Sequence, residues 1–526
     1  MADTALPSPA SDQAGAPHVH RGSAAMPPWQ VGELPAPPVW RSQNWAGMIG
    51  PGLTLAGASV AGGEWLLGPR VGAQFGGALL WIAIVSLACQ YVYNVEASRY
   101  TLYSGESVLT GAFRVRPGPV LWFWIYLLMD LGALLPYQVA SVATPVAAVY
   151  LGRMPNPADP AEVQLLRYLT YAMLTLALTP LVFGGKVYNA LKVLMTTKIV
   201  FVFSFLIFLA VFYSSWATWA DILSGLFKVG TLPAAGGGTT NLFTSLWNGH
   251  WPAVDREALT TFTAFAAIAG VGGLQQASIS NYTREQGWGM GSRVGAIPSL
   301  IGGRKISLSH AGVVFRVTSD ALGRWRGWLR HVKRDQLAMW FPAAVIGLAL
   351  PTMLSIEYLP RGTQADSWIL AGMTADGLAA RVGGTFGAVC WYAILLCGVL
   401  VLLPSAASGA DGFLRRWLDI AWTGLPLFRR LEPHRIRHVY FGFLIIYFVL
   451  GLFFLSIARP LTLVVIYGNM GNLALGVNCF HTIRVNRTLL PPELRPGTWP
   501  CVALALAGVY YVGMAAITAA IALRLF

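Results

Sequence analysis

The chain has 526 residues, of which 55% are hydrophobic and only 11% are charged. Soluble domains carry about 25% charged residues, so this composition excludes an ordinary soluble protein and indicates a membrane protein built from repeated apolar spans. The formal net charge of +14 argues for nucleic-acid binding only if the basic residues cluster accordingly, and their distribution below argues against it.

The first 45 residues differ in kind from the rest of the chain. They are rich in Pro, Ala and Ser, as in "LPSPASDQAGAP", and contain no apolar stretch of the kind found in a signal peptide. Such a composition cannot bury enough apolar surface to fold alone. The sequence therefore predicts that 1–45 is a disordered tail.

Eleven apolar runs follow, each of about the length that crosses a bilayer as a helix. They lie at about 46–68, 74–97, 119–150, 165–183, 191–214, 257–282, 336–356, 382–410, 439–457, 460–481 and 499–525. We predict an all-α membrane protein in two halves of five helices plus an eleventh. Its parts are helices 1–5 (46–214), an outer loop (215–256), helix 6 (257–282), a basic inner loop (283–335), helices 7–10 (336–481), and a linker with helix 11 (482–526).

The basic residues fall mainly on one side of this arrangement. If the N-terminus is cytoplasmic, the predicted inner loops hold 26 Lys and Arg and the outer loops hold 8. Lys and Arg are enriched in cytoplasmic loops of membrane proteins, so the sequence predicts a cytoplasmic N-terminus and an extracytoplasmic C-terminus. The expected location is the cell (inner) membrane, with the lipid bilayer as partner and no nucleic acid.

Two glycine pairs interrupt spans at corresponding positions of the two halves. Helix 1 reads "GASVAGGEW" with Gly62 and Gly63, and helix 6 reads "AAIAGVGGLQQASISN" with Gly272 and Gly273. Broken helices in matching positions are typical of a transport site between inverted repeats, because unwound backbone is tolerated within a membrane only beside a cavity or inside protein. The alternative is that the glycines only allow close helix packing.

Polar side chains inside the apolar runs are the candidate site residues. Glu64 and Asp130 are carboxylates within spans, where an ionisable group is a functional hypothesis by default. Each is expected to be protonated, solvated by a cavity or neutralised by a bound cation; the alternative is a hydrogen bond to a neighbouring helix. Weaker candidates for a substrate path are the amides Gln138, Gln275, Gln276, Asn469 and Asn472.

Enzyme chemistry finds no support in the sequence. The chain has no HExxH, GxSxG or GxxxxGK[ST] motif and no Cys/His cluster. Its five cysteines lie in apolar runs without CxxC spacing, which favours packing roles over a disulfide or zinc site. We therefore expect a protein that is not an enzyme and has no cofactor.

Several stretches resemble the Nramp family of divalent-metal transporters. "GPGLTLAGASVAGGEW", from Gly50 to Trp65, is similar to that family's first helix, which reads roughly G-P-x-x-L-x-x-x-G/A-x-x-D-P-G-N-W. "SRYTLYSGES" resembles A-R-L-G-x-x-T-G-x-D, and "MDLGA" resembles T-D-x-A-E on helix 3. "AGVGGLQQASISN" falls where the family carries A-x-V-M-P-H-N, and the likeness to "DGFLRRW" and "PLFRR" is weaker. The resemblance covers about 45–480.

The resemblance implies a LeuT-type fold, a cation site where broken helices 1 and 6 meet, and alternating access. The family's metal ligands are replaced in this chain: Ala61 stands at the Asp of D-P-G-N, Gly272 at the Met and Leu274 at the His of M-P-H, and Ala133 at the Glu of T-D-x-A-E, while Asp130 is kept. Because the thioether that favours transition metals is missing, manganese or iron is disfavoured.

Three hypotheses follow. The first is a secondary transporter that moves a cation, such as magnesium, with proton coupling. In it Glu64 is the main ligand, Gln275, Gln276 and Asn469 assist, Asp130 lies on a proton path, and the four glycines supply the breaks. The second keeps the fold and moves a small organic solute. The third is a membrane receptor or scaffold that has lost transport.

Overall fold

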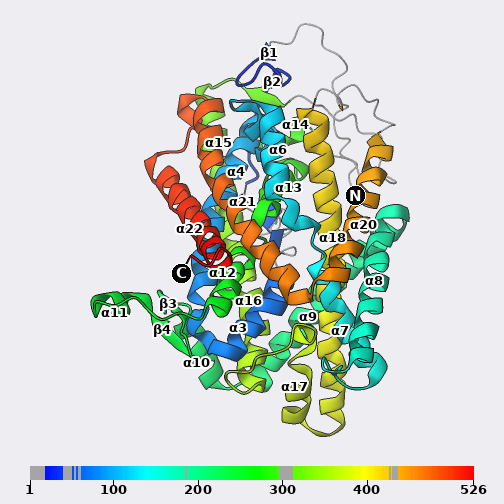
Figure 1. Cartoon of the computed structure of the whole chain (residues 1–526). Helices are drawn as coiled ribbons and strands as arrows, with labels where there is room; N and C mark the ends of the chain where they lie inside the picture. Colours follow the sequence, from blue (N-terminus) through cyan, green and yellow to red (C-terminus); the bar gives the residue numbers. More distant parts are fainter. Residues whose placement is uncertain are drawn as a thin grey trace.

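Long helices make up most of the computed structural model (Figure 1), which describes residues 18–39, 50–52, 55–56, 61–183, 186–294, 312–425, 428 and 436–525. Eight described helices are long and apolar enough to cross a membrane, or up to ten if each of two sharply bent pairs forms one span. This count does not confirm eleven spans. Part of the first predicted run (46–49, 53–54 and 57–60) lies outside the described residues.

The outer surface of the bundle is apolar. Only 28% of the apolar stretch of α20 (Ile436–Ile457) or of α22 (Thr498–Ala522) is buried inside the protein. Large side chains such as Ile445, Val449 and Val509 are exposed instead. Such a surface is unfavourable in water and favourable against lipid tails, so the chain is an integral membrane protein.

The first half of the chain runs from the second part of the first predicted span to α9. Its elements are η2 (Gly63–Leu67), α3 (Gly68–Phe75), η3 (Gly76–Leu79), α4 (Trp81–Ser104), α5 (Val108–Arg114), α6 (Pro119–Met129), η4 (Leu131–Leu134), α7 (Tyr137–Leu151), α8 (Pro160–Phe183) and α9 (Lys186–Phe212).

The second half begins with short helices and strands and then continues with longer helices. Its elements are α10 (Trp216–Gly225), β3 (Thr231–Pro233), β4 (Thr239–Asn241), α11 (Leu242–Trp247), α12 (Arg256–Ile268), η5 (Gly273–Ala277), α13 (Ser278–Glu285), α14 (Gly291–Val294), β5 (Val313–Phe315), α15 (Ser319–Asp335), η6 (Gln336–Trp340), α16 (Phe341–Tyr358), η7 (Leu370–Gly372), α17 (Ala375–Val382), α18 (Gly384–Gly424), α20, α21 (Pro460–Leu489), η8 (Pro492–Leu494) and α22.

The sixth predicted span is interrupted in its middle. The helix α12 stops at Ile268, and helical backbone resumes at Gly273 in η5. Between them Gly270 has φ +101° and Gly272 has φ +73°, and Gly273 itself has φ +55°. These left-handed values are costly for any residue with a Cβ, so three glycines let the chain leave and re-enter the helix here.

The third predicted span is also broken, which differs from the single long helix expected over 119–150. It consists of α6, the short η4 and α7, with an extended residue Leu135 and Pro136 between η4 and α7. Proline has no N–H to donate and fixes its φ angle, so it ends the preceding helix. This break faces the break of the sixth span across a cavity described below.

The helix α18 is longer than expected. The sequence predicts a span over 382–410 followed by a polar loop, whereas α18 runs to Gly424. Beyond 410 the buried residues Phe413, Leu414, Trp417 and Leu418 continue one apolar face. The extension carries Arg416 into the protein interior, where it becomes part of the candidate site.

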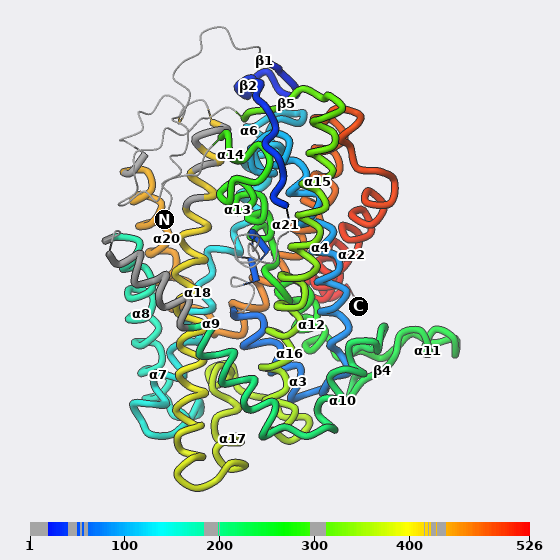
Figure 2. The backbone as a smooth tube through the Cα atoms, turned by 180° about the vertical axis from the view of Figure 1, so that it is seen from behind, coloured from blue at the N-terminus to red at the C-terminus, as the bar shows by residue number. Residues whose placement is uncertain are grey.

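The N-terminal strap, residues 18–39, is ordered although the sequence predicts a disordered tail. It contains β1 (His18–Val19) and β2 (Trp29–Gly32), and β2 pairs in parallel with β5. Figure 2 shows this segment lying beside α15. Its backbone carbonyl oxygens accept hydrogen bonds from the side chains of Arg324 and Trp328 in that helix. The fully buried side chain of Trp29 supplies an apolar contact that the composition of the N-terminal segment alone does not reveal.

A buried ion pair holds the strap against the rest of the protein. Arg114 donates to both carboxylate oxygens of Glu106, at 2.8 and 2.5 Å, and to the carbonyl oxygen of Pro27. Its guanidinium lies 4.7 Å from the ring centre of Trp29. Burial alone raises the pKa of Glu106, but the charge and hydrogen bonds of Arg114 outweigh it, so that this pKa lies below its usual value.

This pair makes stability depend on pH in one direction. Because the pKa of Glu106 is lower in the folded protein, its stabilisation is complete above the unfolded value of about 4.3 and is lost as pH falls through the folded value. We expect the free energy of unfolding of the wild type to exceed that of Glu106→Gln by about 3 kcal/mol at pH 7. Thermal unfolding in detergent should show this difference shrinking below about pH 4; a constant difference would contradict the assignment.

Candidate functional site

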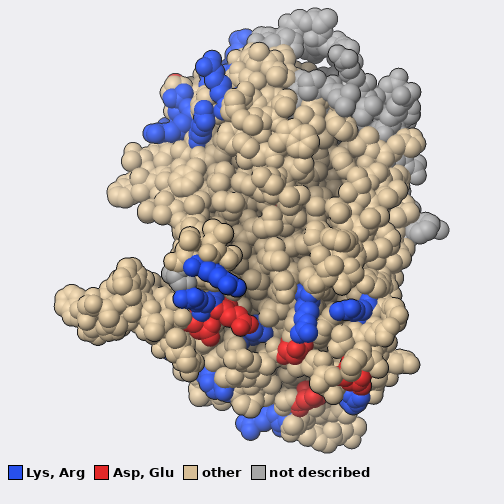
Figure 3. Space-filling view, in the orientation of Figure 1, with Lys and Arg blue, Asp and Glu red and all other residues tan. Residues whose placement is uncertain are grey.

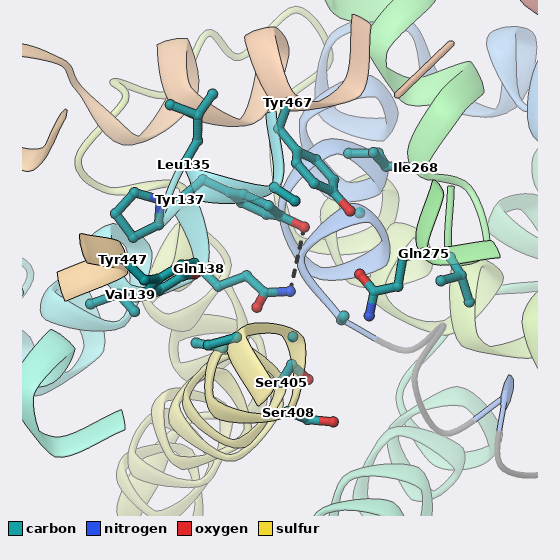
Figure 4. Close-up of a pocket in the computed structure, with 18 of the residues that line it drawn as sticks. Leu135, Tyr137, Gln138, Val139, Ile268, Gln275, Ser405, Ser408, Tyr447 and Tyr467 are labelled. Atoms are coloured by element: carbon teal, nitrogen blue, oxygen red, sulfur yellow. Dashed lines mark hydrogen bonds between the residues drawn. The ribbon is translucent and has the colours of Figure 1, made fainter. Parts of the chain in front are cut away.

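A cavity lies between the two breaks. Its volume is about 60 Å³, and one water molecule needs about 10–15 Å³, so the cavity has room for a few water molecules or one small solute. Its walls come from the first span, the broken third and sixth spans, α18, α20 and α21. Its polar lining residues, most of them labelled in Figure 4, are Tyr137, Gln138, Gln275, Ser405, Ser408, Arg416, Tyr447 and Tyr467.

The lining is aromatic and amidic. The rings of Tyr137 and Tyr467 lie 4.8 Å apart between centres, and Gln138 Nε2 donates to the Tyr137 hydroxyl at 3.3 Å. Figure 4 shows the amide of Gln275 approaching the same space from the sixth span. No carboxylate, thiol or imidazole belongs to the described lining. Hydroxyl and amide groups can both donate and accept, which suits a polar solute.

Glu64 lies beside the cavity without lining it. Its Oε1 accepts the N–H of Gly270 at 2.9 Å, its Oε2 accepts the N–H of Ala61 at 3.2 Å, and the residue is 1% exposed. The carboxylate therefore joins the start of η2 to the unwound part of the sixth span. At the ends of helices such backbone N–H groups have no partner within the helix. By accepting both of them, the Glu64 carboxylate stabilises the interrupted backbone.

A buried lysine that the sequence prediction missed lies near enough to this carboxylate to interact with it electrostatically. Lys198 of α9 donates to Ser405 Oγ at 2.7 Å and attracts Glu64 electrostatically. It interrupts the apolar run "LMTTKIVFVF". A lone Lys within a span is itself a functional signal, and that signal was available from the sequence.

Glu64→Gln is expected to destabilise the protein without loss of a cavity wall. A glutamine offers one oxygen, and its NH2 group would face an N–H donor, so one of the two hydrogen bonds to a charged acceptor is lost. We expect a loss of about 2 kcal/mol in the free energy of unfolding, measured by thermal or chemical unfolding in detergent. The matched variant Glu257→Gln, exposed at the start of α12, should change it by less than about 0.5 kcal/mol.

Asp130 is paired with a cation from a distant segment. Its Oδ2 accepts from Arg416 Nη2 at 2.6 Å and from Trp417 Nε1 at 2.7 Å. Asp130 also lines a second, smaller cavity of about 10 Å³, which shares Gln275 and Tyr467 with the first. The ion pair therefore lies between the two cavities, with Arg416 lining the larger one and Asp130 the smaller one. That Asp130 lies on a proton path stays a prediction.

The two adjacent glutamines have different surroundings. Gln275 lines both cavities. Gln276 donates instead to Asn94 Oδ1 at 2.6 Å, and Asn94 donates to Gln336 Oε1 at 2.8 Å. Gln336 donates to Asp335, whose carboxylate also accepts from the backbone N–H groups of residues 50 and 52. Gln276 thus begins a buried hydrogen-bond chain from the break to the first span.

The other predicted site residues lie away from the cavity or pack beside it. Asn469 donates to the carbonyl oxygens of Thr260 and Val465 and accepts from Thr518, which joins α21 to α12 and α22. Gly63 lines the cavity, and a Cβ there would lie 2.2 Å from the carbonyl oxygen of Ile268. Gly62 has helical angles, φ −68° and ψ −28°, and residues 57–60 before it lie outside the described part.

The predicted metal-binding set is therefore not assembled. Of Glu64, Gln275, Gln276 and Asn469, only Gln275 lines the cavity. Within the described residues, no group of three or more His, Cys, Asp or Glu side chains is placed to hold a metal ion. Divalent cations bind in proteins mainly through carboxylate and carbonyl oxygens, and the described lining does not fit a divalent metal well.

The comparisons with known proteins concern the fold. No family model matches the sequence. An uncharacterized protein of Pasteurella multocida is 33% identical over 94 residues, which are 18% of this chain and 21% of that protein. The chain thus matches only about one fifth of that relative's length, and membership of the Nramp family stays a prediction.

Solved structures show the same architecture. The manganese transporter of Eremococcus coleocola, in complex with an aromatic bis-isothiourea substituted compound, is similar with a TM-score of 0.55 and 14% identity, over 91% of this chain and 87% of that one. A single-substitution mutant of the same transporter gives a TM-score of 0.54 over the same shares. This likeness confirms the all-α, LeuT-type fold that the sequence predicts.

Proposed function

We propose that this protein is a secondary transporter that moves a small polar solute by alternating access around the cavity. The observation that carries the proposal is a cavity with polar groups in its wall that is bounded by two interrupted helices. Interrupted helices beside a cavity are how transporters expose backbone groups within a membrane. The shared fold with a manganese transporter supports the same reading.

The lining favours an organic solute over the cation of the first hypothesis. Tyrosine, serine and glutamine groups surround the space, and the guanidinium of Arg416 lies in its wall. Asp130 balances the charge of Arg416, and no carboxylate of the described lining is left to bind a cation. The available space of about 60 Å³ corresponds to roughly four water-sized molecules, so we infer a small solute.

Charge placement supports a cytoplasmic N-terminus. In Figure 3, Lys and Arg gather at the end of the molecule that carries β1 and β2, and the opposite end mixes both signs. A belt almost without charged side chains separates these ends in that view. Since basic residues remain preferentially in the cytoplasm, we infer that the N-terminal strap is cytoplasmic.

Ligand binding and uptake test the proposal together. Purified full-length protein is screened by thermal shift against magnesium, manganese and a panel of small organic solutes, because only a ligand that binds the folded state stabilises it. Uptake of the stabilising compounds is then measured in proteoliposomes. We expect organic solutes to stabilise and to move, and Gln275→Leu to reduce both.

Each other outcome decides between the hypotheses. The matched variant Gln164→Leu, whose amide contacts an exposed Tyr168, should leave binding and uptake unchanged. Stabilisation and uptake of magnesium or manganese, with no organic solute active, would overturn the solute proposal in favour of cation transport. Binding without any uptake would favour the receptor hypothesis.

A further inference from the structure

Arg416 carries donor groups that nothing in the described protein satisfies. The residue is 4% exposed, and its Nη2 is engaged by Asp130. Its Nε and Nη1 have no hydrogen-bond partner among the described residues. A guanidinium stays charged in proteins, and buried donors without acceptors are costly. This is therefore a built cationic group with unused hydrogen-bonding capacity.

Arg416 is one of the residues in the wall of the cavity, so a solute there lies beside this residue. Arg416 lines the 60 Å³ cavity together with Gln138, Ser405 and Ser408. Asp130, which holds the guanidinium, is not among the residues that line this cavity and faces the smaller one instead. The first cavity therefore has an arginine in its wall and no carboxylate among its described lining residues.

The ion pair fixes the guanidinium in place. Trp417 donates to the same Asp130 oxygen as Arg416, at 2.7 Å, so the carboxylate is held from two sides. A guanidinium that is already oriented loses little freedom on binding a further group. Planar carboxylates match its donor geometry, and such charge-assisted hydrogen bonds are about twice as strong as neutral ones.

We propose that Arg416 binds a carboxylate group of the transported solute, so that the cargo is a small carboxylic acid or amino acid. The inference rests on the proposed transport function and names its substrate class. Arg416 is then the residue that selects for the acidic group, and Gln138, Gln275 and the tyrosine hydroxyls contact the remainder of the solute.

The test compares solutes of one size that differ only in this group. Purified full-length protein in detergent is titrated with acetate and acetamide, propanoate and propanamide, and glycine and glycinamide, with thermal stabilisation as readout. We expect the carboxylates to stabilise the wild type at least tenfold more potently than their amides. This comparison needs no variant, so it holds even if a substitution at Arg416 prevents folding.

A variant then locates the effect. Arg416→Lys keeps a positive charge beside Asp130 but removes the planar donor pair, and we expect it to weaken carboxylate binding about ten- to a hundredfold. The matched variant Arg361→Lys alters an ion pair with Asp221 far from the cavity lining and should leave binding unchanged.

The outcomes separate this inference from the transport proposal. Equal binding of amides and carboxylates, or full carboxylate binding by Arg416→Lys, would overturn the role of Arg416 while leaving solute transport intact. Absence of binding by every carboxylate, with uptake of another solute, would overturn both the role of Arg416 and the substrate class while leaving solute transport intact. Absence of binding and uptake for all organic solutes would remove both.

Discussion

Gly272→Ala is expected to destabilise the folded protein by about 3 kcal/mol, at the upper end of the cost of strained backbone. Gly272 has φ +73° and ψ 166°, a region that only glycine adopts readily. A Cβ there would also lie 2.3 Å from the carbonyl oxygen of Ala267. The unwound segment would have to move, so the cavity wall would move with it. Thermal unfolding and the yield of monodisperse protein measure the effect.

The neighbouring glycine provides the matched control. Gly273 also has a left-handed φ of +55°, but its Cβ would meet nothing closer than Gly471 Cα at 3.4 Å. Gly273→Ala should therefore cost only the backbone term of about 1–2 kcal/mol. Equal effects of the two substitutions would show that the close approach to Ala267 is not what constrains the break.

Asp130→Asn is expected to lower the free energy of unfolding by about 3–5 kcal/mol, because it leaves the buried charge of Arg416 uncompensated. Arg416→Gln should lower the free energy of unfolding by less than Asp130→Asn does. A carboxyl group left alone can take up a proton and become neutral, whereas a guanidinium cannot lose one in a protein. Both members of the pair are almost fully buried, with side chains 5% and 3% exposed.

A double-mutant cycle measures the coupling within the pair. The combined variant Asp130→Asn/Arg416→Gln should be more stable than the sum of the single losses implies, because it removes both charges. Chemical unfolding of the four proteins in one detergent gives the comparison. Strictly additive losses, or a larger loss for Arg416→Gln than for Asp130→Asn, would contradict this account.

The sequence predicts the membrane helices well, because the bilayer itself demands about 20 apolar residues per span. It also identifies the glycines of the sixth span, since left-handed backbone needs residues without a Cβ. The break in the third span is missed. Its signal is present in "DLGALLPYQ", where Pro136 cannot continue a helix, but the run was apolar enough to read as a single long helix.

The direction of individual side chains is harder to predict. Gln275 and Gln276 are adjacent in an irregular segment, where the helical period of 3.6 no longer tells which side faces inward. One lines the cavity and the other bonds to Asn94. Sequence patterns within one span cannot resolve this difference, because tertiary contacts decide it.

Partners from distant segments explain the remaining differences. The cation that neutralises Asp130 lies 286 residues further along the chain, in a stretch expected to be a polar loop. Similarly, Glu64 is held by the backbone N–H of Gly270, 206 residues away. A carboxylate within a span signals that some partner exists, but only the folded arrangement identifies it.

The pairing of the N-terminal strap has a consequence for the order in which the chain can assemble. Gly32 of β2 pairs with Phe315 of β5, 283 residues later, with six predicted spans between them. Closing so long a loop carries an entropic cost and cannot occur before β5 has been synthesised. The strap is thus the first described segment to leave the ribosome and among the last to reach its native neighbours. Docking of Trp29 therefore reports that synthesis and insertion have advanced past Phe315.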